Sequence, residues 1–243
     1  AIELERNLRL DPIVPEGFVL VGPAPQDLVR EQYIVLNEQI LPALAEHGIN
    51  LVRHVDRSEE QRAWVKEYFE REVRPILTPI VLDPSHPFPY ISGLSLNLAV
   101  VVRNKEADNE LFARVKVPPS LPRFIEVSHQ RFVPLEDVIA GHLDKLFPGM
   151  EVLQTHAFRV TRNEELDVEE DDAENLLQAL ERELMRRRFG PAVRLEVENS
   201  IDSHVLDLIV SELGVSQNEV FRLSGPLDHE SFVEFSRLNR DDL

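Results

Sequence analysis

Two small groups of basic residues are the best candidates for chemistry in this sequence. Arg114, Lys116 and Arg123 spread over a predicted strand and the turn that follows it, and Arg159 and Arg162 lie near the end of another strand. Arginine forks match the geometry of phosphate oxygens, so either group could contact a phosphorylated ligand. The excess of acidic residues favours a second interpretation, in which both groups form ion pairs inside the protein.

Motifs for catalysis or cofactor binding are missing from the sequence. It has no cysteine, which excludes disulfides, thiolate zinc sites and cysteine nucleophiles. It also lacks the serine elbow of hydrolases and the glycine-rich phosphate loops, and it has only nine glycines. The eight histidines form neither of the zinc-hydrolase patterns H-x-x-x-H and H-E-x-x-H. We therefore expect no catalytic, cofactor-binding or metal-binding residue in this chain. The histidines are His47, His54, His86, His129, His142, His156, His204 and His229.

An acidic run between residues 164 and 174 is a weak candidate for a metal site. It lacks the spacing and the central glycine of a calcium loop. The acids gather at the start of a predicted helix over 172–189, and Arg186–Arg188 gather at its end. This distribution is the one that the helix dipole favours, so we interpret the run as the start of a helix.

The charge of the chain restricts its partners. Its 243 residues carry a formal net charge of −18, and 43% of them are hydrophobic. Such a field repels nucleic acids and other long polyanions, so we expect no nucleic-acid partner. No run of eighteen apolar residues and no signal peptide is present, which predicts a cytoplasmic protein without a transmembrane segment. The first residue, Ala1, suggests that upstream residues are missing.

Helical periodicity is found in the first third of the chain, after an irregular, proline-interrupted stretch over 1–23. Apolar residues recur at three- and four-residue steps over 27–47, where Pro42 should kink or restart the helix and Gly48 should end it. A second helix should begin at Ser58, because Ser58 and Gln61 have capping-box spacing. Its predicted apolar stripe consists of Trp64, Val65, Tyr68, Phe69 and Val73.

Strand periodicity then replaces the helical pattern. Residues 94–102 are apolar on both sides, as in a strand that is buried on both faces. Residues 111–117 alternate, with Arg114 and Lys116 on the side of Phe112. This order predicts an α+β fold, a mixed sheet with packed helices that follows a helical remnant of another domain. The other predicted elements are strands at 124–127, 131–133, 151–162, 192–198 and 219–223 and helices from Pro134 and at 201–213.

Several unusual strings resemble the head, or middle, domain of the polyphosphate kinase family. The most distinctive string is 77–92, LTPIVLDPSHPFPYIS, where three prolines around His86 indicate a turn. The similar strings occur in the same order as in the family, cover roughly residues 25–243, and are unusual enough to make the resemblance specific. They are 77–92, 94–100, 111–119, 121–124, 146–149, 158–163, 186–190 and 192–197.

The resemblance implies a longer parent enzyme that reversibly transfers the terminal phosphate of ATP to inorganic polyphosphate, with ATP and Mg as its cofactors. In this family the autophosphorylated histidine and the ATP-phosphate-binding residues belong to two carboxy-terminal domains, which are not in this sequence. Residues 1–47 are then the remnant of an amino-terminal helical domain, and residues 48–243 are the head domain. The family also implies a homo-oligomer, and no catalytic residue is carried over to this chain.

Three functions follow as alternatives. The chain could be a non-catalytic head-domain piece that serves as scaffold and subunit contact. It could instead be a stand-alone interaction or regulatory module with the head fold. A third possibility is an enzyme that uses a basic group on phosphorylated substrates, which alanine at Arg159 and Arg162 would test.

Overall fold

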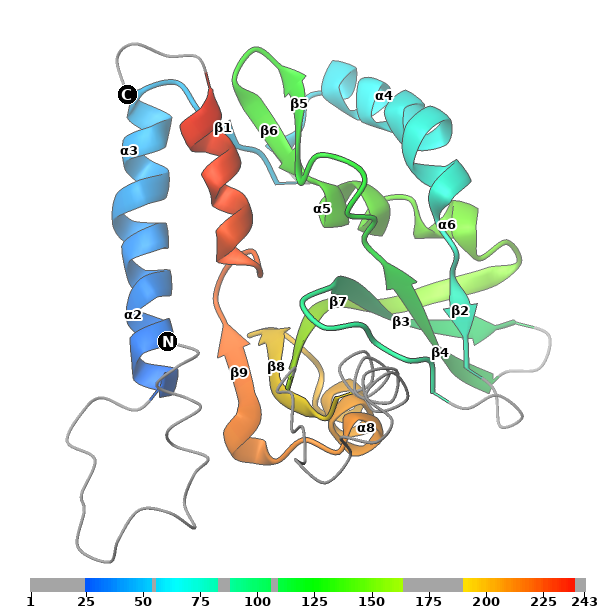
Figure 1. The fold of residues 1–243 in the computed structure, drawn as a ribbon. Coiled ribbons are helices and arrows are strands. Elements are labelled where there is room, and N and C mark those ends of the chain that lie inside the picture. Colours follow the sequence, from blue (N-terminus) through cyan, green and yellow to red (C-terminus); the bar gives the residue numbers. More distant parts are fainter. Residues whose placement is uncertain (1–24, 54–55, 83–87, 106–108, 164–189, 239–243) are drawn as a thin grey trace, which may run out of the picture.

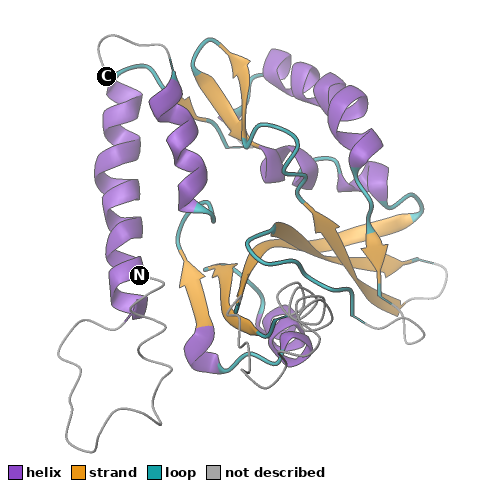
Figure 2. Cartoon of the chain, in the orientation of Figure 1, coloured by secondary structure: helices purple, strands orange, loops and turns teal. Residues whose placement is uncertain are grey.

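The computed structural model describes residues 25–53, 56–82, 88–105, 109–163 and 190–238 (Figures 1 and 2). Two β-sheets carry helices on their faces, and both sheets mix parallel and antiparallel pairs. The predicted α+β fold is therefore confirmed. The predicted helix over 172–189, the acidic run, His54 and His86 lie outside the described residues. Within the described part, no helix is long and apolar enough to cross a membrane.

The larger sheet has six strands in the order β2-β4-β3-β7-β8-β9. Its pairs are antiparallel except β8 with β9, which run parallel. The five predicted strands of this sheet are present, with ends shifted by at most two residues, whereas β2 was not predicted. The bounds are β2 Ile80–Val81, β3 Leu96–Asn104, β4 Asn109–Lys116, β7 Met150–Arg162, β8 Ala192–Glu198 and β9 Val220–Leu223.

The smaller sheet has three strands in the order β1-β6-β5. The two predicted strands, β5 (Phe124–Ser128) and β6 (Arg131–Pro134), form an antiparallel pair, and β1 (Asn50–Leu51) adds to β6 in parallel. The turn between β5 and β6 places Gln130 at a φ of 55°. The sequence pattern did not reveal β1, because a two-residue strand is too short to alternate.

The first helical run consists of α2 (Pro25–Val35), a π-helical turn η1 (Leu36–Ile40) and α3 (Leu41–Glu46). Pro42 lies in the first turn of α3, and the widened π turn directly precedes it. The restart predicted at Pro42 thus takes the form of a π turn, which is a common cause of local change in a helix. Gly48, at a φ of 84°, follows the end of α3 as predicted.

The second helical run, α4 (Glu59–Tyr68) with η3 (Phe69–Val73) and η4 (Arg74–Ile76), begins with the predicted capping box. Its buried stripe is narrower than predicted. Val65, Phe69 and Val73 are at most 1% exposed, whereas Trp64 is 40% exposed. Trp64 lies one position before Val65, about 100° around the helix, so its inclusion in the core was wrong.

The remaining helices pack on the sheets or connect strands. Asp202 caps α8 (Ser203–Leu213) by accepting the backbone N–H of His204 at 2.9 Å, and Gly214 ends the helix at a φ of 65°. A 3-10 helix, η7 (His229–Arg237), follows β9 and was not predicted. The other three are α5 (Leu135–Ala140), α6 (Leu143–Leu146) and η6 (Gln217–Glu219).

The large sheet separates two hydrophobic cores (Figure 1). Strand β3 contributes to both, as predicted: Leu98 and Val100 belong to the core under α4 and α5, and Ala99 belongs to the core under α8. A third, smaller cluster contains Phe132 and Phe235 and joins η7 to the small sheet. Helices α2, η1 and α3 lie beside η7 at one side of the molecule (Figure 1).

Candidate functional site

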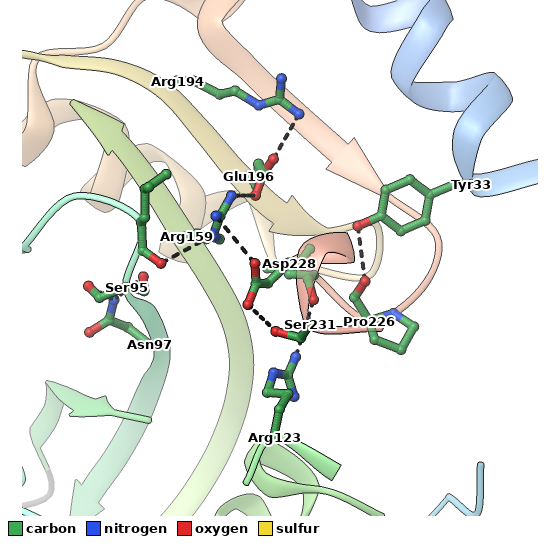
Figure 3. A network of polar contacts seen from close by, with 12 residues as sticks. Tyr33, Ser95, Asn97, Arg123, Arg159, Arg194, Glu196, Pro226, Asp228 and Ser231 are labelled. Carbon is green, nitrogen blue, oxygen red and sulfur yellow. Dashed lines mark hydrogen bonds and ion pairs between the residues drawn. The ribbon is translucent and has the colours of Figure 1, made fainter. Parts of the chain in front are cut away.

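A network of charged side chains lies where η7 meets the large sheet (Figure 3). Its central residue is Asp228, which directly precedes η7 and has a φ of 62°. Arg159 Nη2 lies 3.3 Å from Asp228 Oδ1, and the Ser231 hydroxyl donates a hydrogen bond to the same carboxylate. This contact joins strand β7 to the start of the carboxy-terminal helix.

Arg159 is shared between two carboxylates. Its Nη1 donates to Glu196 Oε2 at 3.1 Å, and its Nε donates to the backbone oxygen of Leu94 at 3.2 Å. Arg194 Nη2 lies 2.7 Å from the other oxygen of Glu196. The Glu196 side chain is 9% exposed and the Arg159 side chain is 11% exposed. Such a chain of alternating charges compensates each ion where water is largely excluded.

Arg123 forms a second, adjacent part of the network. Its side chain is 8% exposed, forms an ion pair with Glu136 and donates to the backbone oxygen of Leu227 at 3.2 Å. In the described part of the chain, its Nε has no hydrogen-bond partner. Burial lowers the pKa of the guanidinium to about 10, and Asp228 is the strongest of the charges that oppose this shift.

Tyr33 attaches helix α2 to the same region. Its hydroxyl donates to the backbone oxygen of Pro226 at 3.0 Å, and its ring lies 3.9 Å from the ring of His229, centroid to centroid. Burial raises the pKa of Tyr33 and lowers the pKa of His229, so both side chains are neutral near pH 7. The network therefore lies between the first and last described helices and the sheet.

The structure groups the five predicted anion-contact residues differently from the sequence. Arg123 and Arg159 both reach residues 227–228, although they were assigned to different groups. Within the described residues, Lys116 donates to Ser92 Oγ at 3.1 Å and shares no hydrogen-bond partner with Arg159. Arg159 and Arg162 are close in sequence, but they lie three positions apart on β7, so the alternation of the strand points them to opposite faces of the sheet.

The other members of the predicted set contact neutral oxygen atoms and one ring. Arg114 is 7% exposed and donates to the Asn97 side-chain oxygen at 2.8 Å. Arg162 donates to the backbone oxygen of Ile91 at 2.6 Å and lies 4.5 Å from the ring centroid of Tyr90. An anion contact by any of the five residues stays a prediction. The contacts of Arg123 and Arg159 are the internal ion pairs of the second interpretation.

Two histidines outside the network also take part in internal packing. His142 Nδ1 lies 2.8 Å from the backbone oxygen of Val138, and its ring stacks on Phe69. Burial lowers the pKa of His156, and its Nδ1 lies 3.9 Å from Glu198 Oε2. The described residues contain no group of three histidine or carboxylate side chains that could hold a metal ion.

Comparison with known proteins assigns this fold to a family. A family model described as the polyphosphate kinase middle domain matches residues 60–235. The chain belongs to the polyphosphate kinase family. It is 57% identical to a polyphosphate kinase of Streptomyces coelicolor over 94% of its length, and 44% identical to one of Mycobacterium tuberculosis over 92%. It spans only about a third of each of these relatives, 31% and 32% of their length.

A solved structure shares the fold of this polyphosphate kinase domain. The crystal structure of the polyphosphate kinase from Porphyromonas gingivalis matches with a TM-score of 0.69 at 24% sequence identity. The match covers 99% of this chain and 34% of that chain. The resemblance found in the sequence strings is thus confirmed for both family and fold.

The central acids of the network were missed by sequence reasoning. Glu196 lies on the polar side of the alternating strand over 192–198, so its burial beneath η7 depended on the missed helix. Asp228 follows a Gly-Pro pair at 225–226, a turn signal that could have indicated the start of a new element.

Proposed function

We propose that this chain is the non-catalytic head domain of a polyphosphate kinase and serves as scaffold and subunit contact. The longer parent would reversibly transfer the terminal phosphate of ATP to inorganic polyphosphate through a phosphohistidine. The single observation that carries the proposal is the match of residues 60–235 to the middle domain alone, within relatives about three times as long.

The contacts of the histidines support the non-catalytic role. A phosphohistidine needs a ring nitrogen that substrate can reach and nearby cations that neutralise the transferred phosphoryl group. His142 instead stacks on Phe69, and the half-buried ring of His229 packs against Tyr33. We assign ATP and Mg to the parent's other domains, since the described residues do not gather a ligand set for a metal.

The proposal includes the arrangement of the parent. Residues 1–47 would be the remnant of the amino-terminal helical domain and residues 48–243 the head domain, with the boundary at the turn after α3. Its partners would be the carboxy-terminal catalytic domains, a second copy of the parent, and polyphosphate held by the parent. We place the parent in the cytoplasm, consistent with a chain that has no cysteine.

Labelling with ATP tests the non-catalytic role. The purified chain and a full-length polyphosphate kinase from Streptomyces coelicolor would be incubated with Mg and terminally labelled ATP, then scored for acid-labile label on histidine. We expect label on the full-length enzyme and none on the chain. Label on the chain would show that one of its eight histidines is a nucleophile and would overturn the proposal.

Sedimentation velocity tests the subunit contact separately. A head domain that carries the contact should shift from monomer to a larger species as its concentration rises. A chain that stays monomeric at every concentration, while the full-length relative is oligomeric, would assign the contact to other domains.

A further inference from the structure

A small pocket with polar and apolar walls opens beside the charge network, at the end of the large sheet where β3 begins and β4 ends. Its volume is about 340 Å³, at the lower end of the range for ligand sites. Among the residues that line it, Figure 3 labels Ser95, Arg123, Asp228 and Ser231. Lys116 and Ser92 line it as well.

Lys116 gives the pocket a positive charge that no acid of the described residues neutralises. Among these residues the only contact of its ammonium is the Ser92 hydroxyl at 3.1 Å. An ammonium group that keeps donors available beside a cavity suits an anionic ligand.

Arg123 also lines the pocket, but its guanidinium is engaged in internal contacts. Its side chain is 8% exposed, and its buried Nε has no hydrogen-bond partner among the described residues. Glu136 and the Leu227 carbonyl occupy its other nitrogens.

The two carboxylates of the pocket wall already have partners. Asp228 pairs with Arg159 and accepts from Ser231, and Glu234 accepts the backbone N–H groups of Arg123 and Phe124 at 3.2 and 3.4 Å. The charge of both carboxylates is therefore partly compensated by these internal contacts. The three serine hydroxyls of the wall add donors that can turn toward a bound anion.

Backbone strain is concentrated at the same pocket. In the described part, three non-glycine residues have a positive φ, and two of them, Leu94 at 58° and Asp228 at 62°, line the pocket. A leucine in this region is an outlier, and such strain gathers at functional sites because the surrounding structure has to enforce it.

We propose that this pocket binds a phosphate group through Lys116 and the serine hydroxyls of its wall. The ligand is either free inorganic phosphate or pyrophosphate, or the end group of a polyphosphate chain. The second source rests on the proposed function, whereas the first does not. Of the five basic residues predicted for anion contact, Lys116 and Arg123 line the pocket, and we assign the anion to Lys116. The four arginines make internal contacts.

Isothermal titration calorimetry at constant ionic strength tests the pocket. The chain would be titrated with inorganic pyrophosphate and, in a separate arm, with long-chain polyphosphate. Loss of one charge-assisted contact should make binding to the K116Q variant weaker by about tenfold. K116R should bind more tightly than K116Q, because it keeps the charge. K66Q removes an exposed lysine on α4, far from the pocket, and should bind like the wild type.

Each outcome decides the proposal. Binding of pyrophosphate that depends on Lys116 supports a free anion, and Lys116-dependent binding of the long chain alone supports its end group. No binding in either arm overturns the proposal, as does equal weakening by K116Q and K66Q. Circular dichroism of each variant checks that it is folded. Because the titration contains no ATP, its failure leaves the proposed non-catalytic role to the labelling experiment.

Discussion

Arg159 and Asp228 lie 3.3 Å apart, and their ion pair joins the middle of the large sheet to the last described helix. Arg159 also pairs with Glu196, so one guanidinium serves two largely buried carboxylates. The head domain thereby fixes its carboxy-terminal element through charge as well as through the aromatic cluster of Phe132 and Phe235. This attachment gives a scaffold a defined orientation toward the domains that we propose to follow it.

Replacing Arg159 with methionine should destabilise the domain strongly. Glu196 and Asp228 would stay largely buried without their shared cation, which should lower the free energy of unfolding by about 3 kcal/mol. Urea denaturation followed by circular dichroism measures this change. The matched control is Arg71→Met, which removes an arginine from exposed pairs with Glu67 and Glu72 and should change nothing measurable. Equal effects of the two variants would contradict the importance of burial.

Truncation of two aromatic residues of the second helical run should lower stability by very different amounts. Phe69 is fully buried and stacks on His142, so Phe69→Ala should cost about 3–5 kcal/mol of stability. Trp64→Ala should cost far less, since Trp64 is 40% exposed. Urea titration of both variants ranks them. A larger loss for Trp64 would mean that this side chain is buried in solution, for example by a second copy.

Helix caps and strands could be predicted from local sequence, whereas the buried side of a helix could not. Ser58 with Gln61 and Gly48 after α3 were predicted correctly, because caps depend on residues within one turn. The strands were found through alternation. Trp64 was misplaced because a helical stripe shows which residues are apolar and leaves open which side the tertiary structure covers.

The candidate site was less predictable than the fold. The meeting of Arg123 with Arg159 near Asp228 depends on strand order and on η7, neither of which periodicity reveals. Basic residue type alone suggested the set, and only the contacts separate Lys116 from the arginines that already have partners.

The cap of α8 offers a local test of stability. Asp202 accepts the first N–H groups of the helix, so Asp202→Ala should lower the free energy of unfolding by about 1 kcal/mol. Asp207→Ala removes an exposed acid from the same helix without a cap and serves as the control. The midpoint of urea denaturation should fall only for Asp202→Ala, and an equal fall in both variants would point to net charge as the cause.

The pH dependence of stability should contain a contribution from His229. Burial lowers its pKa in the folded state below the ordinary value of 6.5, whereas the unfolded chain keeps that value. As the pH falls below 6.5, the unfolded state therefore binds a proton first, and stability is lost until the folded state also becomes protonated.

The variant His229→Phe keeps an aromatic ring beside Tyr33 and removes this titration. Stability curves of the wild type and the variant should be parallel above pH 6.5 and diverge below it, with the wild type losing more. His156, whose pKa is also lowered, contributes to both curves and cancels in their difference. Curves that stay parallel down to the acid transition would show that His229 titrates normally in the folded state.

Relief of strain at Leu94 should stabilise the domain. The residue is 50% exposed and holds a φ of 58°, a conformation that costs a leucine about 1–2 kcal/mol and glycine almost nothing. Glycine also raises the entropy of the unfolded chain, which offsets part of this relief. We therefore expect the free energy of unfolding, measured by urea denaturation, to rise by only about 0.5–1 kcal/mol. Leu94→Ala keeps the Cβ and hence the strain, and it should not stabilise. If the glycine variant is no more stable than the alanine variant, the left-handed backbone at the pocket is not strained. Backbone strain would then no longer mark this pocket as a binding site, and Lys116 alone would do so.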